Sequence, residues 1–488
     1  MIRKITLLFL AMLFVQLSAF SQRKCGSDIV HQRLMATDPA YAANDAAFRA
    51  KWQAFMATYA NNPQALKALV GSGPDTVFEI PVVVHVLRAG NTGDHALGER
   101  YNPSDAQIQA YIDYTNAAFA ANYTGYPTPT TGGTRIPFKL VLAKRDTNCN
   151  AATGIVRINA ATTFSNYLNE GIDLDNTVGG GVNEVALKNL SRWRTSVYYN
   201  IYIVNKIDGE DGYNSTAAYT AGYAYYPGAS SNVDGAVLLA STVFYRASGT
   251  GAWTAGGPGN ITLPHEFGHA MNLKHVFDPF PSTSGCPSAT NCSSTGDEVC
   301  DTQPIASSNF SCPTSSTLTC NGVPNDGVTA HNMMDYSNCQ DRFTQGQLLR
   351  MMYALKNQTT RSTFITSLGA TAPPSSSLPT ACVPTTAANS FNLGVYDVIV
   401  TTGNNPSPAA DTLMHVTCSG YLGDGSVGYI NHTCTHRVTM TAGTTYKLFV
   451  NVGTGTTTSR ARVFIDYNND GTFNTTTEQV MPLSAAGS

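Results

Sequence analysis

Hydrophobic positions predict alternating strands and helices over the middle of the chain. Residues 80–87 form a continuous apolar run, rich in valine, that is typical of a buried strand. Ser104 is placed to cap a helix, because an apolar face follows it at helical spacing. Further strands are expected at 137–142, 198–207, 222–227 and 233–239. Alternation of this kind predicts one large α/β or α+β domain at 78–370.

The flanking regions have a different character. Residues 39–70 are rich in alanine with aromatic residues at helical spacing, and a glycine-broken stretch follows, so a helical pro-segment is expected at 22–77. A linker rich in proline and serine is expected at 371–384. Beyond it, 385–488 alternates in period two and predicts an all-β module, a sandwich.

Composition narrows the class of protein. The formal net charge is −3 and only 12% of the 488 residues are charged, which argues against a nucleic-acid binder. Residues 1–21 have a basic start, a short apolar run and small residues near Ser21, which predicts an export signal. A retained N-terminal anchor is the alternative, and no later segment is apolar enough to predict a membrane span. Export would place the 11 cysteines in an oxidising compartment, and their odd number leaves one thiol unpaired.

The strongest chemical signal is the sequence HEFGHAMNLKH at 265–275. His265 and His269 lie four residues apart and share one face of a helix, so they can bind one zinc ion. His275 can reach the same ion only if the chain turns sharply at Asn272, a residue type that tolerates the left-handed region. Glu266 stands beside the first ligand, where it can act as a general base on a water molecule.

The extended HExxHxxxxxH spacing, followed by NMMDYSNC at 332–339 and FTQGQ at 343–347, resembles the pappalysin branch of the metzincin zinc proteases. By this resemblance Met334 is the methionine of the turn beneath zinc. Tyr336 supplies a hydroxyl that contacts zinc or the transition state.

The resemblance extends to the loop between these motifs. Residues 296–304 are similar to a family segment near which calcium binds, so Asp297 and Asp301 are calcium candidates, with solvated loop carboxylates as an equal alternative. The family's two interlocked disulfides imply the pairs Cys286–Cys320 and Cys312–Cys339. Cys292 and Cys300 are left as a third pair. The partners of Cys149, Cys382, Cys418 and Cys434 are not readable.

Residues 23–26 (RKCG) resemble the cysteine switch of latent metzincins, in which the Cys25 thiolate is the fourth zinc ligand and keeps out the catalytic water. A disulfide to Cys149 or a lipid-type anchor cysteine is the alternative. Residues 461–480 resemble the GEVED modules of secreted bacterial enzymes. Asp466, Asn468 and Asp470 there have the alternation of a calcium loop, although an asparagine-rich turn explains them equally well.

Together these features predict a secreted, latent zinc metalloendopeptidase that acts on proteins or peptides, with zinc and a candidate calcium as cofactors and surface attachment through the C-terminal module. A substrate strand is expected to pair with an edge strand within 222–239. Residues 337–338 are neutral where relatives that cut beside arginine or lysine carry an acidic residue, so a polar or apolar preference is as plausible. An inactive zinc-containing adhesin and a cell-wall amidase are the alternative functions.

Overall fold

The computed structural model describes residues 23–481, except for internal stretches of which the longest are 60–68, 123–132, 244–260, 374–394, 418–435 and 453–460. The predicted signal at 1–21 and the four cysteines without an assigned partner lie outside the described residues. Within the described part, no helix has the length and apolar character needed to cross a membrane.

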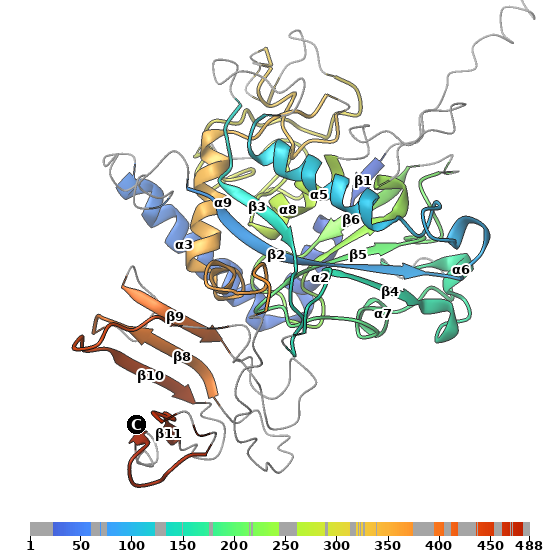
Figure 1. Cartoon of the computed structure of the whole chain (residues 1–488). Coiled ribbons are helices and arrows are strands. Elements are labelled where there is room, and N and C mark those ends of the chain that lie inside the picture. The colour runs from blue at the N-terminus through green and yellow to red at the C-terminus, as the bar shows by residue number, and fades with distance from the viewer. Residues whose placement is uncertain are drawn as a thin grey trace, which may run out of the picture.

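One large mixed sheet organises the catalytic region, with the strand order β1-β6-β7-β5-β2-β3 and β4 paired to β2 (Figure 1). β2 (Phe78–Arg88) is its long central strand and pairs in parallel with three neighbours. The expected strands are present, whereas β1 and β4 were not predicted. The remaining bounds are β1 Arg23–Cys25, β3 Phe138–Leu142, β4 Ile155–Asn159, β5 Tyr199–Val204, β6 Tyr219–Ala224 and β7 Ala236–Leu239.

Alternate residues of β2 pack on opposite faces of this sheet. Val82 and Val84 join a hydrophobic cluster with the helices α5 (Asp105–Phe119) and α8 (Thr262–Ala270). Ser104 begins α5 as predicted, because its side chain and that of Gln107 form a reciprocal capping box. Leu87 points to the other face, where short helices and loops cover the sheet. These short helices are α6 Tyr167–Glu170 and α7 Glu184–Lys188.

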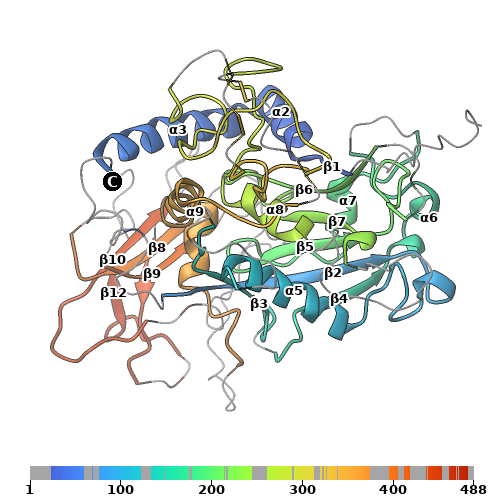
Figure 2. The same cartoon turned by 90° about the horizontal axis from the view of Figure 1, so that it is seen from above.

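The N-terminal segment wraps the catalytic region instead of standing apart from it. After β1 it forms α2 (Ser27–Thr37) and α3 (Pro39–Tyr59), which follow one another along one side of the molecule (Figure 2). Val30 of α2 is buried in the cluster beneath one face of the sheet, and Trp52 of α3 is buried in the cluster on the other. Part of the predicted helix at 39–70 lies outside the described residues.

A long loop connects α8 to α9 (Gln345–Asn357), and disulfides hold it together. The structure joins Cys286 to Cys320 and Cys312 to Cys339, the two pairs that the resemblance implied. It also joins Cys292 to Cys300, the two cysteines that were left as a third pair. The short helix α10 (Thr359–Ser362) follows α9.

The described C-terminal elements are all strands. β8 (Val395–Thr401) lies between β9 (Thr412–Thr417) and β10 (Lys447–Val452) in an antiparallel sheet. A second pair is β11 (Val463–Phe464) with β12 (Gln479–Met481). The predicted β character of this region fits these strands, and a complete sandwich stays a prediction.

Candidate active site

The turn after α8 brings the third histidine back toward the first two. α8 ends at Ala270, and Asn272 then takes a φ of +70°, the left-handed conformation expected for this position. Arg350 of α9 fixes the turn, because its guanidinium donates to the Asn272 carbonyl and side-chain oxygens, both at 2.7 Å. His265, His269 and His275 therefore converge, and all three are buried.

The three imidazoles meet through their Nε2 atoms, which lie 3.1, 3.2 and 3.3 Å apart. Nitrogen ligands about 2.0–2.1 Å from a tetrahedral zinc ion are separated by about 3.4 Å. The spacing in this chain therefore matches three corners of a zinc tetrahedron.

The other ring nitrogen of each histidine faces an acceptor. His265 Nδ1 lies 2.6 Å from the Met333 carbonyl oxygen, His269 Nδ1 lies 2.7 Å from the Leu273 carbonyl oxygen, and His275 Nδ1 lies 2.9 Å from Asp28 Oδ2. Nδ1 must carry the proton to donate there, so each Nε2 presents a lone pair. Three lone pairs at such short range repel each other unless a cation lies between them, and borderline-soft imidazoles suit zinc.

Cys25 supplies the fourth donor of this group. Its sulfur and the three imidazole nitrogens lie within 4.8 Å of one another, the set expected for a latent zinc site. Cys25 has no disulfide, and its thiol also lies 3.3 Å from Glu266 Oε2. Burial, and then the charge of Glu266, raise the pKa of this thiol well above its usual value when no metal charge is considered. A thiol that coordinates zinc is instead deprotonated.

Glu266 lies at the centre of the polar contacts. Its carboxylate accepts hydrogen bonds from Cys25 and from the Ser27 hydroxyl, the latter at 3.1 Å. Burial raises the pKa of Glu266 to about 7, although these hydrogen bonds and the charge of His275 act in the opposite direction. A carboxylate with a pKa near neutrality is well matched to general-base work.

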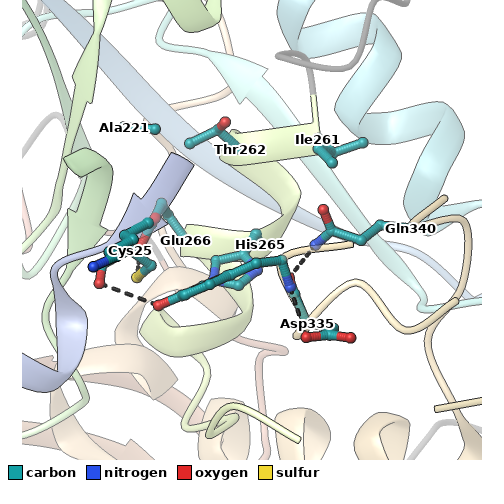
Figure 3. A pocket seen from close by; sticks show the side chains of 10 residues that line it. Cys25, Ala221, Ile261, Thr262, His265, Glu266, Asp335 and Gln340 are labelled. Atoms are coloured by element: carbon teal, nitrogen blue, oxygen red, sulfur yellow. Dashed lines mark hydrogen bonds between the residues drawn. The ribbon is translucent and has the colours of Figure 1, made fainter. Parts of the chain in front are cut away.

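The strand β1 carries Cys25 into the site along the sheet edge. It pairs in parallel with β6, and Gly26 N donates to the Gly222 carbonyl oxygen at 2.9 Å. The Cys25 carbonyl oxygen accepts a hydrogen bond of 3.2 Å from the Tyr336 hydroxyl (Figure 3). The edge strand expected to bind substrate is therefore occupied by β1.

Two contacts from this segment were not foreseen. The Ser27 hydroxyl bridges Glu266 and the Ala224 backbone N–H, and Asp28 bonds to His275. Serine and aspartate are common near helix starts, so nothing in their local sequence distinguishes these two from ordinary capping residues.

Met334 lies beneath the zinc helix as the resemblance implied. A β-carbon added at Gly268 would lie 2.5 Å from the Met334 sulfur, so glycine is required for this close approach. The rings of Tyr336 and His275 pack edge to face, with their centroids 5.1 Å apart. Burial raises the pKa of the Tyr336 phenol well above its usual value, with Cys25 adding to the effect, so its hydroxyl stays a hydrogen-bond donor.

A small cavity of about 30 Å³ remains beside the pro-segment in this site. Ala221, Ile261, Thr262 and Gln340 line it together with the site residues already named (Figure 3). Asp335 also borders the cavity, but its carboxylate accepts two hydrogen bonds from Asn309 and is fully buried.

The calcium candidates have protein partners in this structure. Asp297 accepts hydrogen bonds from Thr302 and from a backbone N–H, whereas Asp301 accepts from the Thr344 hydroxyl and the Gly346 N–H at the start of α9. Among the described residues, neither belongs to a group of three or more side chains placed to share a metal. Calcium at this loop stays a prediction.

Glu298, between those candidates, was not singled out by the sequence. It has a φ of +59° and is buried, and its carboxylate contacts Arg350, Lys274 and Arg49. Burial on its own would raise the pKa of Glu298, but these three cations hold it at about 2. Because Arg49 belongs to α3, this ion cluster links the pro-segment to the residue that clamps the Asn272 turn.

Comparisons with known proteins agree with the chemistry of this site. Residues 183–356 match the peptidase family described as pregnancy-associated plasma protein-A. An extracellular metalloprotease of Arthroderma otae is 26% identical over 302 residues, which cover 59% of this chain and 84% of that protein. An extracellular metalloprotease of Podospora anserina is 30% identical over 171 residues, 34% of this chain and 50% of that protein.

Among solved structures, mature mirolysin of Tannerella forsythia in complex with a cleaved peptide is 26% identical, with a TM-score of 0.45. The match covers 62% of this chain and all of mirolysin. The family match, the extracellular metalloprotease relatives and the histidine cluster define a metallopeptidase. Residues 183–356 of this chain are therefore similar to the peptidases of the pregnancy-associated plasma protein-A, or pappalysin, family.

Proposed function

We propose that this chain is a secreted zinc metalloendopeptidase that is made latent, with zinc held by His265, His269 and His275. The convergence of the three Nε2 atoms carries the proposal, because each Nδ1 proton is directed away from the shared centre. The extracellular metalloprotease relatives support secretion.

In the proposed reaction, zinc held by the three histidines would supply a Lewis acid that polarises the scissile carbonyl and lowers the pKa of a water molecule, so that its hydroxide can attack. Glu266 accepts the proton of that water and later delivers it to the leaving amine, a role that its pKa of about 7 suits. The Tyr336 hydroxyl donates to the oxygen that gains negative charge. In the latent form this hydroxyl is occupied by the Cys25 carbonyl oxygen.

Latency is proposed to follow from three simultaneous blocks by β1 and by Ser27, the first residue of α2. Cys25 takes the fourth donor position, Ser27 and Cys25 hydrogen-bond the general base, and the β1 backbone covers the β6 edge. A substrate strand needs that same edge for main-chain hydrogen bonds. Removing the segment would free the edge, the base and the donor position together.

Side-chain preference is proposed to be for an uncharged residue. The described lining beside His265 offers an amide, a hydroxyl and aliphatic groups, from Gln340, Thr262 and Ile261. The Asp335 carboxylate that borders it is already saturated by Asn309 and the Tyr336 N–H. Apart from the general base Glu266, this lining therefore offers an arginine or lysine side chain only the Asp335 carboxylate, which already accepts three hydrogen bonds.

Zinc content and casein hydrolysis by the processed enzyme test the proposal. We expect about one zinc ion per chain, activity abolished by a chelator, and a loss of about 10²- to 10⁴-fold in Glu266→Ala with zinc retained. Glu79→Gln is the matched control, because Glu79 is an exposed carboxylate of β2 paired only with Lys139. Full activity of Glu266→Ala, or absence of zinc, would refute the proposal.

The same assay separates the alternatives. An adhesin would hydrolyse neither casein nor peptidoglycan, and an amidase would act on peptidoglycan alone. Latency is tested with unprocessed Cys25→Ala, which we expect to hydrolyse casein and to process itself faster than the wild-type chain. Equal latency of the two unprocessed chains would remove Cys25 from the inhibitory role.

A further inference from the structure

The zinc histidines differ in what supports them. The Nδ1 atoms of His265 and His269 bond to the carbonyl oxygens of Met333 and Leu273, which both belong to the catalytic region. His275 Nδ1 instead bonds to the Asp28 carboxylate at 2.9 Å, and Asp28 belongs to α2 of the pro-segment. If the pro-segment leaves, one of the three hydrogen bonds that hold the histidine rings at Nδ1 is therefore lost.

We propose that Asp28 is a positioning residue of the zinc site that operates only in the latent enzyme and raises its affinity for the metal. This inference rests on the proposed zinc role of the three histidines. A partner on the distal ring nitrogen fixes the tautomer and the ring orientation of a histidine ligand and increases its basicity. A charged carboxylate does so more strongly than a neutral carbonyl oxygen.

The position of His275 makes this support consequential. His265 and His269 are held by the backbone of α8, whereas His275 lies beyond the Asn272 turn, outside any helix or strand. The His275 ring also packs on Phe277 and Tyr336, with centroids 4.6 and 5.1 Å away. These ring contacts limit its tilt, but among the described partners of Nδ1 only Asp28 supplies an acceptor.

The contact is specific to the folded pro-segment. Asp28 lies in the first turn of α2, and the neighbouring Ser27 is tied to Glu266 and to the Ala224 N–H of β6. With Cys25 on the same stretch, residues 25–28 reach the metal donor set, the general base and the third histidine. The segment that blocks catalysis is thus also placed to keep zinc in the site before activation.

If Asp28 supports the zinc site, its loss should lower zinc affinity even in a chain that has no Cys25 thiol, a result that thiol coordination alone does not predict. The background is the full chain with Cys25→Ala and Glu266→Ala, which removes the thiolate and prevents self-processing. Zinc affinity is measured at equilibrium by competition with a chromophoric chelator, since restricted access changes rates but not equilibrium constants. In this background we expect Asp28→Ala to weaken zinc binding about 10- to 100-fold. The zinc affinity of Asp28→Asn should lie between that of the parent chain and that of Asp28→Ala.

The matched control is Asp38→Ala in the same background. Asp38 accepts hydrogen bonds from the N–H groups of Ala40 and Tyr41 at the start of α3, so its loss loosens the pro-segment without touching His275. We expect zinc affinity to stay within about twofold in this control. Mature Glu266→Ala, which lacks the pro-segment, should bind zinc as weakly as the Asp28→Ala chain.

The outcomes distinguish the inference from the proposed function. Unchanged affinity in Asp28→Ala, or an equal loss in Asp38→Ala, would overturn the positioning role while leaving the zinc enzyme intact. A parent chain that binds no zinc at all would overturn the proposed function itself.

Discussion

Asn332 and Gln347 exchange two side-chain amide hydrogen bonds, of 3.0 and 2.8 Å, between the methionine turn and the start of α9. Asn332 Oδ1 also accepts from the Met334 N–H at 2.9 Å, which sets the shape of the turn. Gln347 Oε1 accepts from the Thr344 N–H and completes a capping box at α9. The asparagine of the turn motif and the glutamine of the helix motif therefore form one structural unit.

Asn332→Ala should destabilise the protein by about 2–3 kcal/mol, because both amides are buried and the Gln347 amide would be left without its partner. Urea unfolding of the chain measures this change. The double variant Asn332→Ala/Gln347→Ala should lose less than the sum of the two single losses, since each single change already breaks both bonds. Strictly additive losses would show that the pair does not act as a unit.

Elements that depend on neighbouring residues could be predicted from the sequence, whereas contacts between residues far apart in the chain could not. The zinc helix, the β2 run and the Ser104 cap depend on residues close in sequence, so spacing alone predicted them. The Asn332–Gln347 exchange, the Asp28–His275 bond and the Glu298 cluster join residues 15 to 247 positions apart. Polar side chains such as these look like ordinary loop or helix-end residues until the fold brings them together.

Strand β1 illustrates the same difficulty. Its three residues carry no hydrophobic alternation, and the strand exists because the β6 edge offers backbone partners. β4 was missed although Ile155–Asn159 pairs in parallel with β2, because its residues are only half-buried and give a weak pattern. The histidine cluster could be predicted because all three histidines lie within eleven consecutive residues, two of them at helical spacing and the third after a turn-forming asparagine, whereas the residues that support them lie far away in the sequence.

Gly268→Ala should impair both stability and the metal site, because the new methyl group would lie 2.5 Å from the Met334 sulfur beneath the zinc helix. Overpacking of this kind costs about 1–3 kcal/mol. Thermal unfolding and zinc content measure the effect. The double variant Gly268→Ala/Met334→Ala should lose less stability than the sum of the two single losses, because truncation of Met334 makes room for the methyl group, and strictly additive losses would contradict the steric explanation.

The stability of the latent chain should fall in acid through Glu298. Its folded pKa of about 2 lies below the value of about 4.5 for an unfolded glutamate, so its contribution is complete above pH 4.5 and is lost as pH falls toward 2. A difference of about 2.5 pKa units corresponds to about 3 kcal/mol at neutral pH.

Glu298→Gln isolates this effect. At pH 7 it should unfold at lower urea concentration than the wild-type chain, because Arg350, Lys274 and Arg49 lose their shared carboxylate. At pH 3 the gap between the two chains should shrink to less than half. A gap independent of pH would show that the carboxylate charge contributes nothing to the cluster.

Trp52 should anchor α3, and with it the inhibitory strand, to the catalytic region. Its side chain is 1% exposed, its ring lies 5.4 Å from the Arg350 guanidinium and 5.6 Å from the Tyr353 ring, and its Nε1 donates to the Glu298 carbonyl oxygen at 3.3 Å. Replacing a buried tryptophan with alanine typically costs about 3–5 kcal/mol. In Trp52→Ala, α3 would lose its packing against Arg350 and Glu298, the ion cluster that supports the Asn272 turn.

We therefore expect the unprocessed Trp52→Ala chain to exchange its α3 amide hydrogens at least about 100-fold faster than the wild-type chain, and to show higher casein hydrolysis before processing. The neighbouring Lys51→Ala is the control, because Lys51 lies in the same turn of α3 but is exposed. If Trp52→Ala kept full protection in α3 and full latency, the contacts made by Trp52 would not be needed to hold the pro-segment. Inhibition would then depend on the remaining contacts, among them those of β1 and α2 with β6, Glu266 and His275.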